Sequence, residues 1–170
     1  VLYRGSAVLL VDCGPQVPAV LVPKLTGPDE LDAIYVTHSH ADHCFGLGSL
    51  LLWLRLAGRK RPLVLYAEVE TLQRLSELLK LGYPGAFTPE KCFPLEWQPL
   101  TSNRSVRCLG CVLSVAQTDH NVTNCALRID DGAVRIAFSG DGIVTAQTLK
   151  LYAGCDWVVQ ECAYAEQEHT

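Results

Sequence analysis

Three of the chain's five histidines, His38, His40 and His43, fall within the stretch "THSHADH", with Asp42 among them. Imidazole nitrogens and carboxylate oxygens are ligands that zinc and related divalent ions accept. Alternate side chains of an extended segment point the same way, so His38 and His40 can bind one ion. The chain then turns into a predicted helix, and Asp42 and His43 emerge in a new direction, where they can hold a second ion. Two ions about 3.5–4 Å apart activate a water and stabilise a developing oxyanion. A histidine-rich solvated loop is the alternative, and the spacing disfavours it.

Three more distant residues extend this set. His120, in "TDH", follows a predicted strand and can supply the third imidazole of the first ion. Asp141, in "FSGDG", stands between glycines at a strand end, where its carboxylate can reach into a site. His169 is the weakest candidate, because it lies one residue from the end of the chain. Each of them alone would be an ordinary surface or turn residue, and only the cluster makes them candidate ligands.

The elements that position these residues alternate along the chain. Apolar runs bounded by glycine and proline predict strands, and apolar residues at helical spacing predict helices that end at signals such as Gly58. The expected strands cover 6–14, 31–37, 62–67, 106–118, 124–141 with a turn at Asp131-Gly132, and 156–163. The expected helices cover 18–25, 45–57, 69–82 and 146–154. This order predicts sheets covered by helices.

Composition narrows the class of protein. The 170 residues predict one domain, and 49% hydrophobic with 19% charged residues is globular composition. A net charge of -4 gives no overall attraction to nucleic acid or an anionic membrane, and no apolar run reaches the roughly 18 residues of a membrane span. The basic run "GRKRP" at 58–62 is expected to be a solvated helix end rather than a phosphate-binding patch. The chain has no methionine and no visible secretory signal, so we expect residues to be missing before Val1.

Eight cysteines are scattered through mostly apolar surroundings, which is typical of buried thiols in a reducing compartment and predicts a cytoplasmic protein. Cys108 and Cys111 form a CxxC motif. Structural zinc needs a second pair of ligands, and no other pair has suitable spacing. We therefore expect two thiols on a half-buried strand.

Several of these motifs together resemble the metallo-β-lactamase superfamily, and within it the ribonuclease Z-like branch. The resemblance rests on "LLVDCG", "THSHADH", "TDH", "FSGDG", "CDWVVQECAY" and the terminal "EHT", and it covers about Val8 to Thr170. It implies a four-layer αββα sandwich, an α/β (α+β) fold with its site at one edge of the sheets. It also implies two divalent metal ions, zinc or else manganese, with a hydroxide bridging them as the nucleophile.

The resemblance assigns roles to named residues. His38, His40 and His120 would hold the first ion, with Asp141 bridging to the second. Asp42, His43 and His169 would complete the second, and Asp42 would also orient the hydroxide. Asp12 and Glu161 would support the ligands from behind.

Departures from the family pattern decide the branch. The β-lactamases of this superfamily carry cysteine where Asp141 stands, so β-lactam hydrolysis is disfavoured. Two further departures count against a full transfer-RNA processing enzyme. The branch's His-Glu-Ala-Thr motif begins here with Gln160, which cannot act as a general acid. Only residues 121–140 lie between His120 and Asp141, which leaves no room for the arm that grips a transfer RNA.

Acyl hydrolases of the superfamily also carry an aspartate at the position of Asp141, and the segment "DWVVQECAY" resembles the phosphodiesterases more than them. The resemblance therefore favours a phosphodiesterase acting on a small molecule or RNA, without a membrane partner. An acyl hydrolase acting on a lactone or thioester is the first alternative, and a metal-binding relative without turnover is the second. Relatives are commonly dimers, which implies a homodimer.

Overall fold

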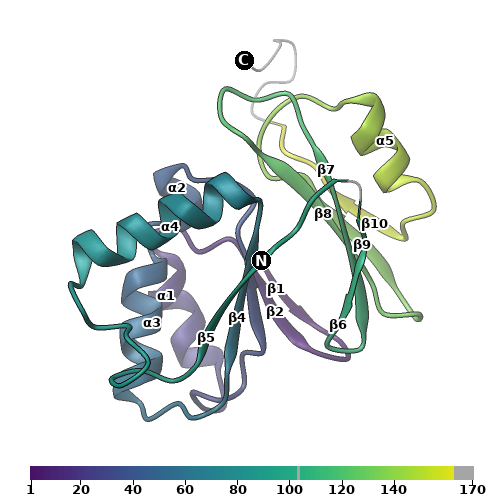
Figure 1. Ribbon diagram of the computed structural model, residues 1–170. Helices are drawn as coiled ribbons and strands as arrows, with labels where there is room; N and C mark the ends of the chain where they lie inside the picture. Colours follow the sequence, from purple (N-terminus) through teal and green to yellow (C-terminus); the bar gives the residue numbers. More distant parts are fainter. Residues whose placement is uncertain (103, 163–170) are drawn as a thin grey trace.

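Two five-stranded β-sheets face each other in the computed structural model, which describes residues 1–102 and 104–162 (Figure 1). The first sheet has the order β1-β2-β3-β4-β5, with β1 antiparallel to β2 and the other pairs parallel. Its strands are β1 (Leu2–Arg4), β2 (Val8–Val11), β3 (Ala33–Tyr35), β4 (Leu63–Ala67) and β5 (Leu95–Pro99).

The second sheet has the order β10-β9-β8-β7-β6. Its neighbours are antiparallel except β9 and β10, which are parallel. Its strands are β6 (Val106–Cys108), β7 (Cys111–Gln117), β8 (Cys125–Asp130), β9 (Arg135–Phe138) and β10 (Trp157–Val159).

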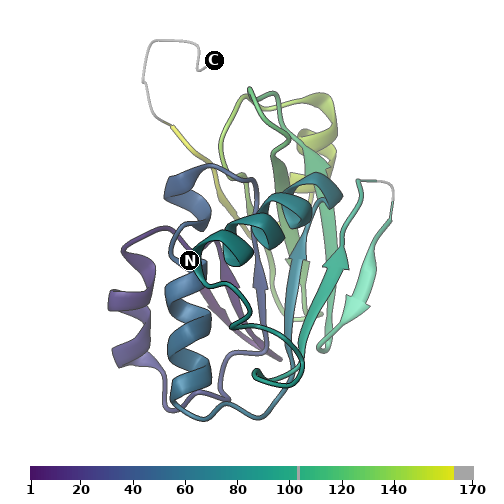
Figure 2. The same cartoon turned by 60° about the vertical axis from the view of Figure 1, so that its left-hand side comes forward.

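Helices lie on the outer faces of both sheets, as the two views in Figures 1 and 2 show. The first sheet carries α1 (Val17–Leu21), the short 3₁₀ helix η1 (Val22–Lys24), α2 (Ala41–Cys44), α3 (Leu47–Leu56) and α4 (Val69–Gly82). The second sheet carries α5 (Ala146–Tyr152), which packs against β7 and β8. The four-layer αββα sandwich implied by the resemblance is confirmed.

Two apolar cores explain the layering. Side chains alternate between the faces of a strand, so Leu10 of β2 lies in the core under the helices while its neighbours Leu9 and Val11 lie in the core between the sheets. Tyr35 belongs to the second core and is fully buried, and its hydroxyl donates 2.7 Å to the carbonyl of Cys125 on the opposite sheet. This alternation assigns each side chain to one of the two cores and so specifies the pairing register of the strands within the sheet.

Strand directions bring the candidate ligands to one edge. The carboxyl ends of β2, β3 and β4 meet at one edge of the first sheet because these strands are parallel. In the second sheet β7 and β9 both run antiparallel to β8, so their carboxyl ends also share an edge. The backbone N–H of Cys125 donates 3.1 Å to the carbonyl of Thr37, which joins the two edges directly.

Several expected elements are confirmed, and others need correction. The helix at 69–82 is confirmed at both ends, and Gly58 follows α3 with a φ of 86°. The single helix expected over 45–57 is wrong at its start. The chain forms α2 first and begins α3 after Gly46, whose N–H donates 2.8 Å to the carbonyl of Cys13. Strands β1 and β5 were not expected.

The segment 106–118 is a hairpin rather than one strand. Its turn is formed by Leu109 and Gly110 with φ of 52° and 78°, which is the positive-φ pair of a tight two-residue hairpin. Cys108 and Cys111 therefore lie opposite each other on β6 and β7, not along one strand as expected. The described residues contain no disulfide.

The basic run after α3 is exposed as expected at Lys60 and Arg61, and the expectation is corrected at one residue. Arg59 is 3% exposed, and its guanidinium donates to the carbonyl oxygens of Pro28, Leu31, Arg61 and Pro62. It therefore ties loops together instead of forming a solvated helix end. None of the helices in the described part of the chain combines the length and apolarity that a membrane crossing requires.

Candidate metal centre

The turn after β3 delivers two histidines in extended backbone. His38 is fully buried, and its Nδ1 lies 3.0 Å from the hydroxyl of Thr37. Its Nε2 is buried without a hydrogen-bond partner among the described residues. Burial, followed by the nearby charges of His43, His40 and His120, lowers the pKa of His38 to about 3. The ring is therefore neutral at physiological pH, which is the form that binds a metal ion.

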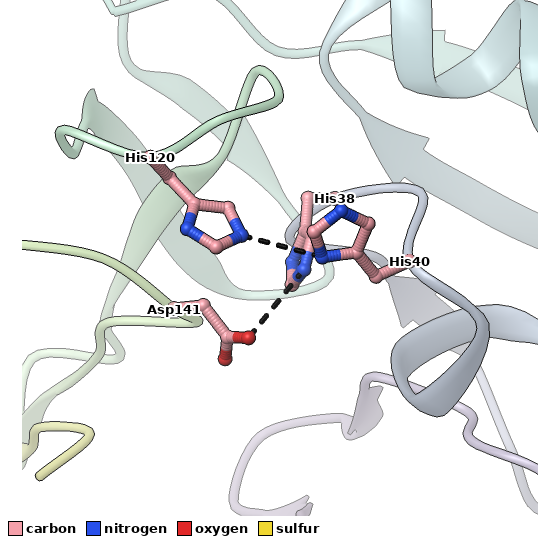
Figure 3. A group of neighbouring side chains, drawn as sticks. All are labelled: His38, His40, His120 and Asp141. Carbon is pink, nitrogen blue, oxygen red and sulfur yellow. Dashed lines mark hydrogen bonds and ion pairs between the residues drawn. The ribbon is translucent and has the colours of Figure 1, made fainter. Parts of the chain in front are cut away.

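Three imidazoles and one carboxylate converge at this turn (Figure 3). The group comprises His38, His40, His120 and Asp141, whose ligand atoms all lie within 4.8 Å of one another. His120 Nε2 is 3.3 Å from His40 Nδ1, and His38 Nε2 is 3.7 Å from Asp141 Oδ2. We call these four residues the first group. The expected convergence of the two sheets' histidines is present.

A second group lies beside the first and shares one residue with it. It comprises Asp42, His43 and Asp141. His43 Nε2 is 3.1 Å from Asp141 Oδ1 and 3.6 Å from Asp42 Oδ2. The Asp42 side chain is 77% exposed at the start of α2, so solvent reaches this side of the site. The two oxygens of Asp141 thus face two different sets of ligands.

Asp12 supports the turn from behind. It follows β2 with a φ of 60°, a left-handed conformation that aspartate tolerates better than most residues. Its Oδ1 accepts 2.8 Å from the backbone N–H of Thr37, and its Oδ2 lies 2.8 Å from Nδ1 of His43. Burial lowers the pKa of His43, but the hydrogen bond and charge of Asp12 with the charges of Asp141 and Asp42 outweigh it, so the pKa is raised overall. The contact turns His43 Nε2 toward Asp141.

The loop that carries Asp141 is shaped by glycine and by one buried amide. Gly142 has a φ of 96°, and a Cβ there would lie 2.5 Å from the carbonyl oxygen of Asp119. Asn124 is fully buried. Its Nδ2 donates to the Thr118 hydroxyl (2.7 Å) and to the carbonyls of Ser139 (3.0 Å) and Asp141 (2.6 Å). One side chain therefore connects the His120 loop to the Asp141 loop.

The segment after β10 supports the same loop. Glu161 Oε2 accepts 3.0 Å from the N–H of Gly142. Burial raises the pKa of Asp141, and the charge of Glu161 adds to this while His43 opposes it. Gln160 is directed elsewhere: its Oε1 accepts 3.1 Å from the Tyr152 hydroxyl and its Nε2 donates 3.3 Å to the carbonyl of Glu161. His169 lies outside the described residues.

Sequence reasoning missed the residues that hold the ligand loops. Asn124, Thr37 and Thr118 are buried polar residues beside the ligands, and each is hydrogen-bonded. Asn124 opens the strand "NCALRID", where no spacing pattern distinguishes it from a turn residue. The available signal was a polar residue at a strand end within a few positions of a candidate ligand.

These side chains suit divalent metal ions. A buried imidazole nitrogen without a hydrogen-bond partner, as at His38, is costly unless it meets a cation or another donor. The imidazole nitrogens fit zinc and related transition ions better than calcium or magnesium. The Asp12 contact to the far nitrogen of His43 is the usual support of a histidine metal ligand.

Comparison with known proteins gives a family and a fold. A model of the family described as "Anti-Pycsar protein Apyc1" matches residues 1–170. A ribonuclease Z of Methanococcus maripaludis is 34% identical over 82 residues, which is 48% of this chain and 27% of that protein. The probable metallo-hydrolase YhfI of Bacillus subtilis is 29% identical over 175 residues, which is 98% of this chain and 65% of that protein.

Solved structures agree with the architecture. The crystal structure of YhfI, a metallo-β-lactamase fold protein, has a TM-score of 0.78 at 22% identity and covers 98% of this chain and 65% of that one. Human tRNase Z, short form, has a TM-score of 0.70 at 21% identity and covers 92% of this chain and 68% of that one. At these identities the likeness establishes the fold. The chain therefore spans about a quarter of the ribonuclease Z, and about two thirds of YhfI and of human tRNase Z.

Proposed function

Because the chain belongs to the anti-Pycsar protein Apyc1 family, in the ribonuclease Z-like branch of the metallo-β-lactamase superfamily, we propose that it is a binuclear metal-dependent phosphodiesterase. The first group would hold one ion and the second group the other. The proposed ligands of the second ion include His169, which lies outside the described residues. Zinc is the proposed ion, with manganese as the alternative.

The position of Asp141 is the observation that carries this proposal. One carboxylate oxygen faces His38 at 3.7 Å, and the other faces His43 at 3.1 Å. A mononuclear site would need only one of these sets. Two ligand sets that meet at a shared carboxylate are the arrangement expected of a two-ion hydrolase.

The bound ions would supply a hydroxide nucleophile between them and neutralise charge on the phosphate. The chain's own residues prepare that site. Asp12 fixes the ring of His43, and Asn124 fixes the backbone of Asp141. The carboxylate of Asp42 is exposed and lies 3.6 Å from His43 Nε2, where it can accept a hydrogen bond from the attacking water and orient it.

Two features support a phosphodiester as the substrate class. Asp141 stands where β-lactamases of the superfamily carry cysteine, and a second carboxylate, Asp42, lies in the same cluster. The connection between the ligands of the second sheet is short, since β8 and β9 occupy half of residues 121–140. A small diester fits this site better than the body of a transfer RNA.

Substrate panels test the proposal. Metal-loaded protein should hydrolyse bis-p-nitrophenyl phosphate, with rates on nitrocefin and a thioester panel lower by orders of magnitude. Asp42→Asn should lower the diester rate by about 10²–10⁴-fold if the carboxylate assists the attacking water. Asp119→Asn is the matched control, because Asp119 is exposed next to His120 but outside both groups, and its rate should stay at the wild-type level.

Other outcomes have separate meanings. Preferential turnover of thioesters would favour an acyl hydrolase instead. Binding of two ions with no turnover of any substrate would favour the metal-binding relative without catalysis. Comparable rates on nitrocefin and the diester would show that the substrate class is wrong.

A further inference from the structure

Three side chains link the two ligand-bearing loops outside the metal groups. Glu70, in the first turn of α4, accepts two hydrogen bonds. Its Oε1 accepts one from Arg74 Nη2 (2.7 Å), and its Oε2 accepts one from the Thr123 hydroxyl (2.9 Å). Arg74 Nη1 makes a longer contact of 3.5 Å to the hydroxyl of Ser39. We call Arg74, Glu70 and Thr123 the strap.

The strap connects the two halves of the molecule. Glu70 and Arg74 belong to α4, which packs against the first sheet, whereas Thr123 belongs to the loop between β7 and β8 of the second sheet. At one end Ser39 lies between His38 and His40, and at the other Thr123 lies three residues after His120. Each end of the strap is therefore next to ligands of the first group.

Among the described residues, the loop that carries His120 meets the first half at His120 itself, whose Nε2 lies 3.3 Å from His40 Nδ1. Its backbone pairs with its own sheet, because Asp119 bonds with Ile143 and the Thr118 N–H donates 3.1 Å to the carbonyl of Asn124. At its base the Cys125 N–H donates to Thr37. Thr123 adds a side-chain hydrogen bond to the first half, three residues after His120.

We propose that Glu70 is a positioning residue for the first metal group, which acts by holding the His120 loop against α4 through Thr123. The inference rests on the metal centre of the proposed function. His120 comes from one sheet and His38 with His40 from the other, so the relative position of the sheets' loops sets the distance between these ligands. A loop that moves away weakens the binding of the first ion more than that of the second, whose described ligands include neither His120 nor His40.

The exposure of the strap's charged side chains indicates that the strap contributes to the metal site and not to the stability of the fold. The side chains of Arg74 and Glu70 are 50% and 49% exposed. Exposed i,i+4 pairs of this kind contribute little to folding. Loss of the strap should therefore leave the fold intact, and its effect should appear in the metal site.

The chain contains a matched control for the strap. Arg4, Glu30 and Thr26 form the same kind of trio, in which Arg4 pairs with Glu30 and the Thr26 hydroxyl donates 2.7 Å to Glu30 Oε2. This trio lies before β3, at the edge of the sheet opposite the ligands. A threonine change in each trio removes the same hydrogen bond in two places, of which only one is near the site.

Titration with cobalt(II), followed by its visible absorption bands, measures the effect without activity. Thr123→Val should lower the affinity of one of the two binding steps by about tenfold and alter the bands of that step, as loss of supporting contacts does at other metal sites. His120→Ala identifies the step, because it removes a ligand of the first group. Thr123→Ser keeps the hydroxyl and should restore both affinity and bands, and Thr26→Val should match the wild type.

Glu70 itself provides a second pair of variants. Glu70→Ala should weaken the same step as Thr123→Val, at an exposed position where folding is not at risk. Glu70→Gln should weaken it less, because the Thr123 hydroxyl can rotate to accept from the amide while Arg74 keeps the oxygen.

Two results would contradict the proposed role of the strap. One is a Thr123→Val protein that titrates like the wild type, and the other is an equal loss in Thr26→Val. A wild-type protein that binds no ion would instead contradict the proposed function, so the two failures are distinguishable.

Discussion

The two sheets supply the metal ligands in different ways. The first sheet supplies them from one turn after β3, where a stretch of six residues contains His38, His40, Asp42 and His43. The second sheet supplies His120 and Asp141 from two loops separated by β8 and β9. The turn is visible in the sequence as a motif, whereas the loops are brought together only by folding.

The supports differ in the same way. One carboxylate, Asp12, holds the turn by bonding both Thr37 and His43. The loops depend on the buried amide of Asn124, on the closely packed Gly142 and on Glu161 from a third segment. A site built from distant segments thus needs more internal hydrogen bonds, and its ligands should be the more sensitive to changes nearby.

The largest expected effect follows removal of the shared carboxylate. Asp141→Ala should abolish tight binding of both ions, because each group loses a ligand. Diester hydrolysis should fall about a thousandfold or more, since bound ions contribute several kcal/mol to the barrier. Metal analysis after dialysis measures this, with Asp119→Ala as the control that retains both ions. An Asp141→Ala protein that keeps two ions would show that the carboxylate is not shared.

Removal of a ligand that belongs to one group only should cost one bound ion instead of two. His120→Ala should lower the affinity for one ion by at least about 100-fold, and His43→Ala should lower the affinity for the other, because the two residues belong to different groups. Competition with a chromophoric chelator measures both steps. Equal weakening of both steps by either variant would mean that the ions do not bind independently of one another.

Asn124→Ala tests the dependence of the loops on one amide. The change removes one donor from the buried Thr118 hydroxyl and from the carbonyls of Ser139 and Asp141, although Asp141 still accepts 2.8 Å from the Thr118 hydroxyl. The free energy of unfolding should fall by about 1–3 kcal/mol, measured by urea denaturation of metal-free protein. Asn121→Ala, at an exposed position of the same loop, should stay within about 0.5 kcal/mol of the wild type. Equal stability of Asn124→Ala and Asn121→Ala would contradict the dependence of the loops on Asn124.

The smallest expected effect concerns Gln160. The amide bonds to Tyr152 and to the carbonyl of Glu161, not to either metal group. Gln160→His should therefore change the rates on aryl and alkyl phosphodiesters by the same small factor. A selective gain on alkyl diesters would instead place residue 160 at the leaving group, where a new acid contributes about 10²–10⁴-fold.

The sequence predicted the contiguous part of the site and most of the fold. The apolar pattern of 69–82 gave α4 correctly, because its buried face recurs at helical spacing. It did not reveal β5, "LEWQP", an edge strand with mixed exposure and a proline at its end, which forms because β4 offers a free edge. Nor did it separate α2 from α3, since their boundary is set by the contact of Gly46 with Cys13 and Gly14, far away in the sequence.

For the site the same limit applies. The histidine and aspartate spacing identified the groups, but the supporting residues Asn124, Thr118 and Thr123 have no pattern of their own. Their roles arise from tertiary hydrogen bonds, which sequence spacing does not encode. Asp12 was found only because a family motif contains it.

Metal stoichiometry tests the central claim most directly. Two ligand groups that share Asp141 predict two divalent ions per chain in protein supplemented with zinc or manganese and then freed of excess metal. Mass spectrometry of the native protein and elemental analysis should both give this value, and Asp141→Ala should give less than one ion per chain. A wild-type value that stays at one under saturating metal would contradict the binuclear centre.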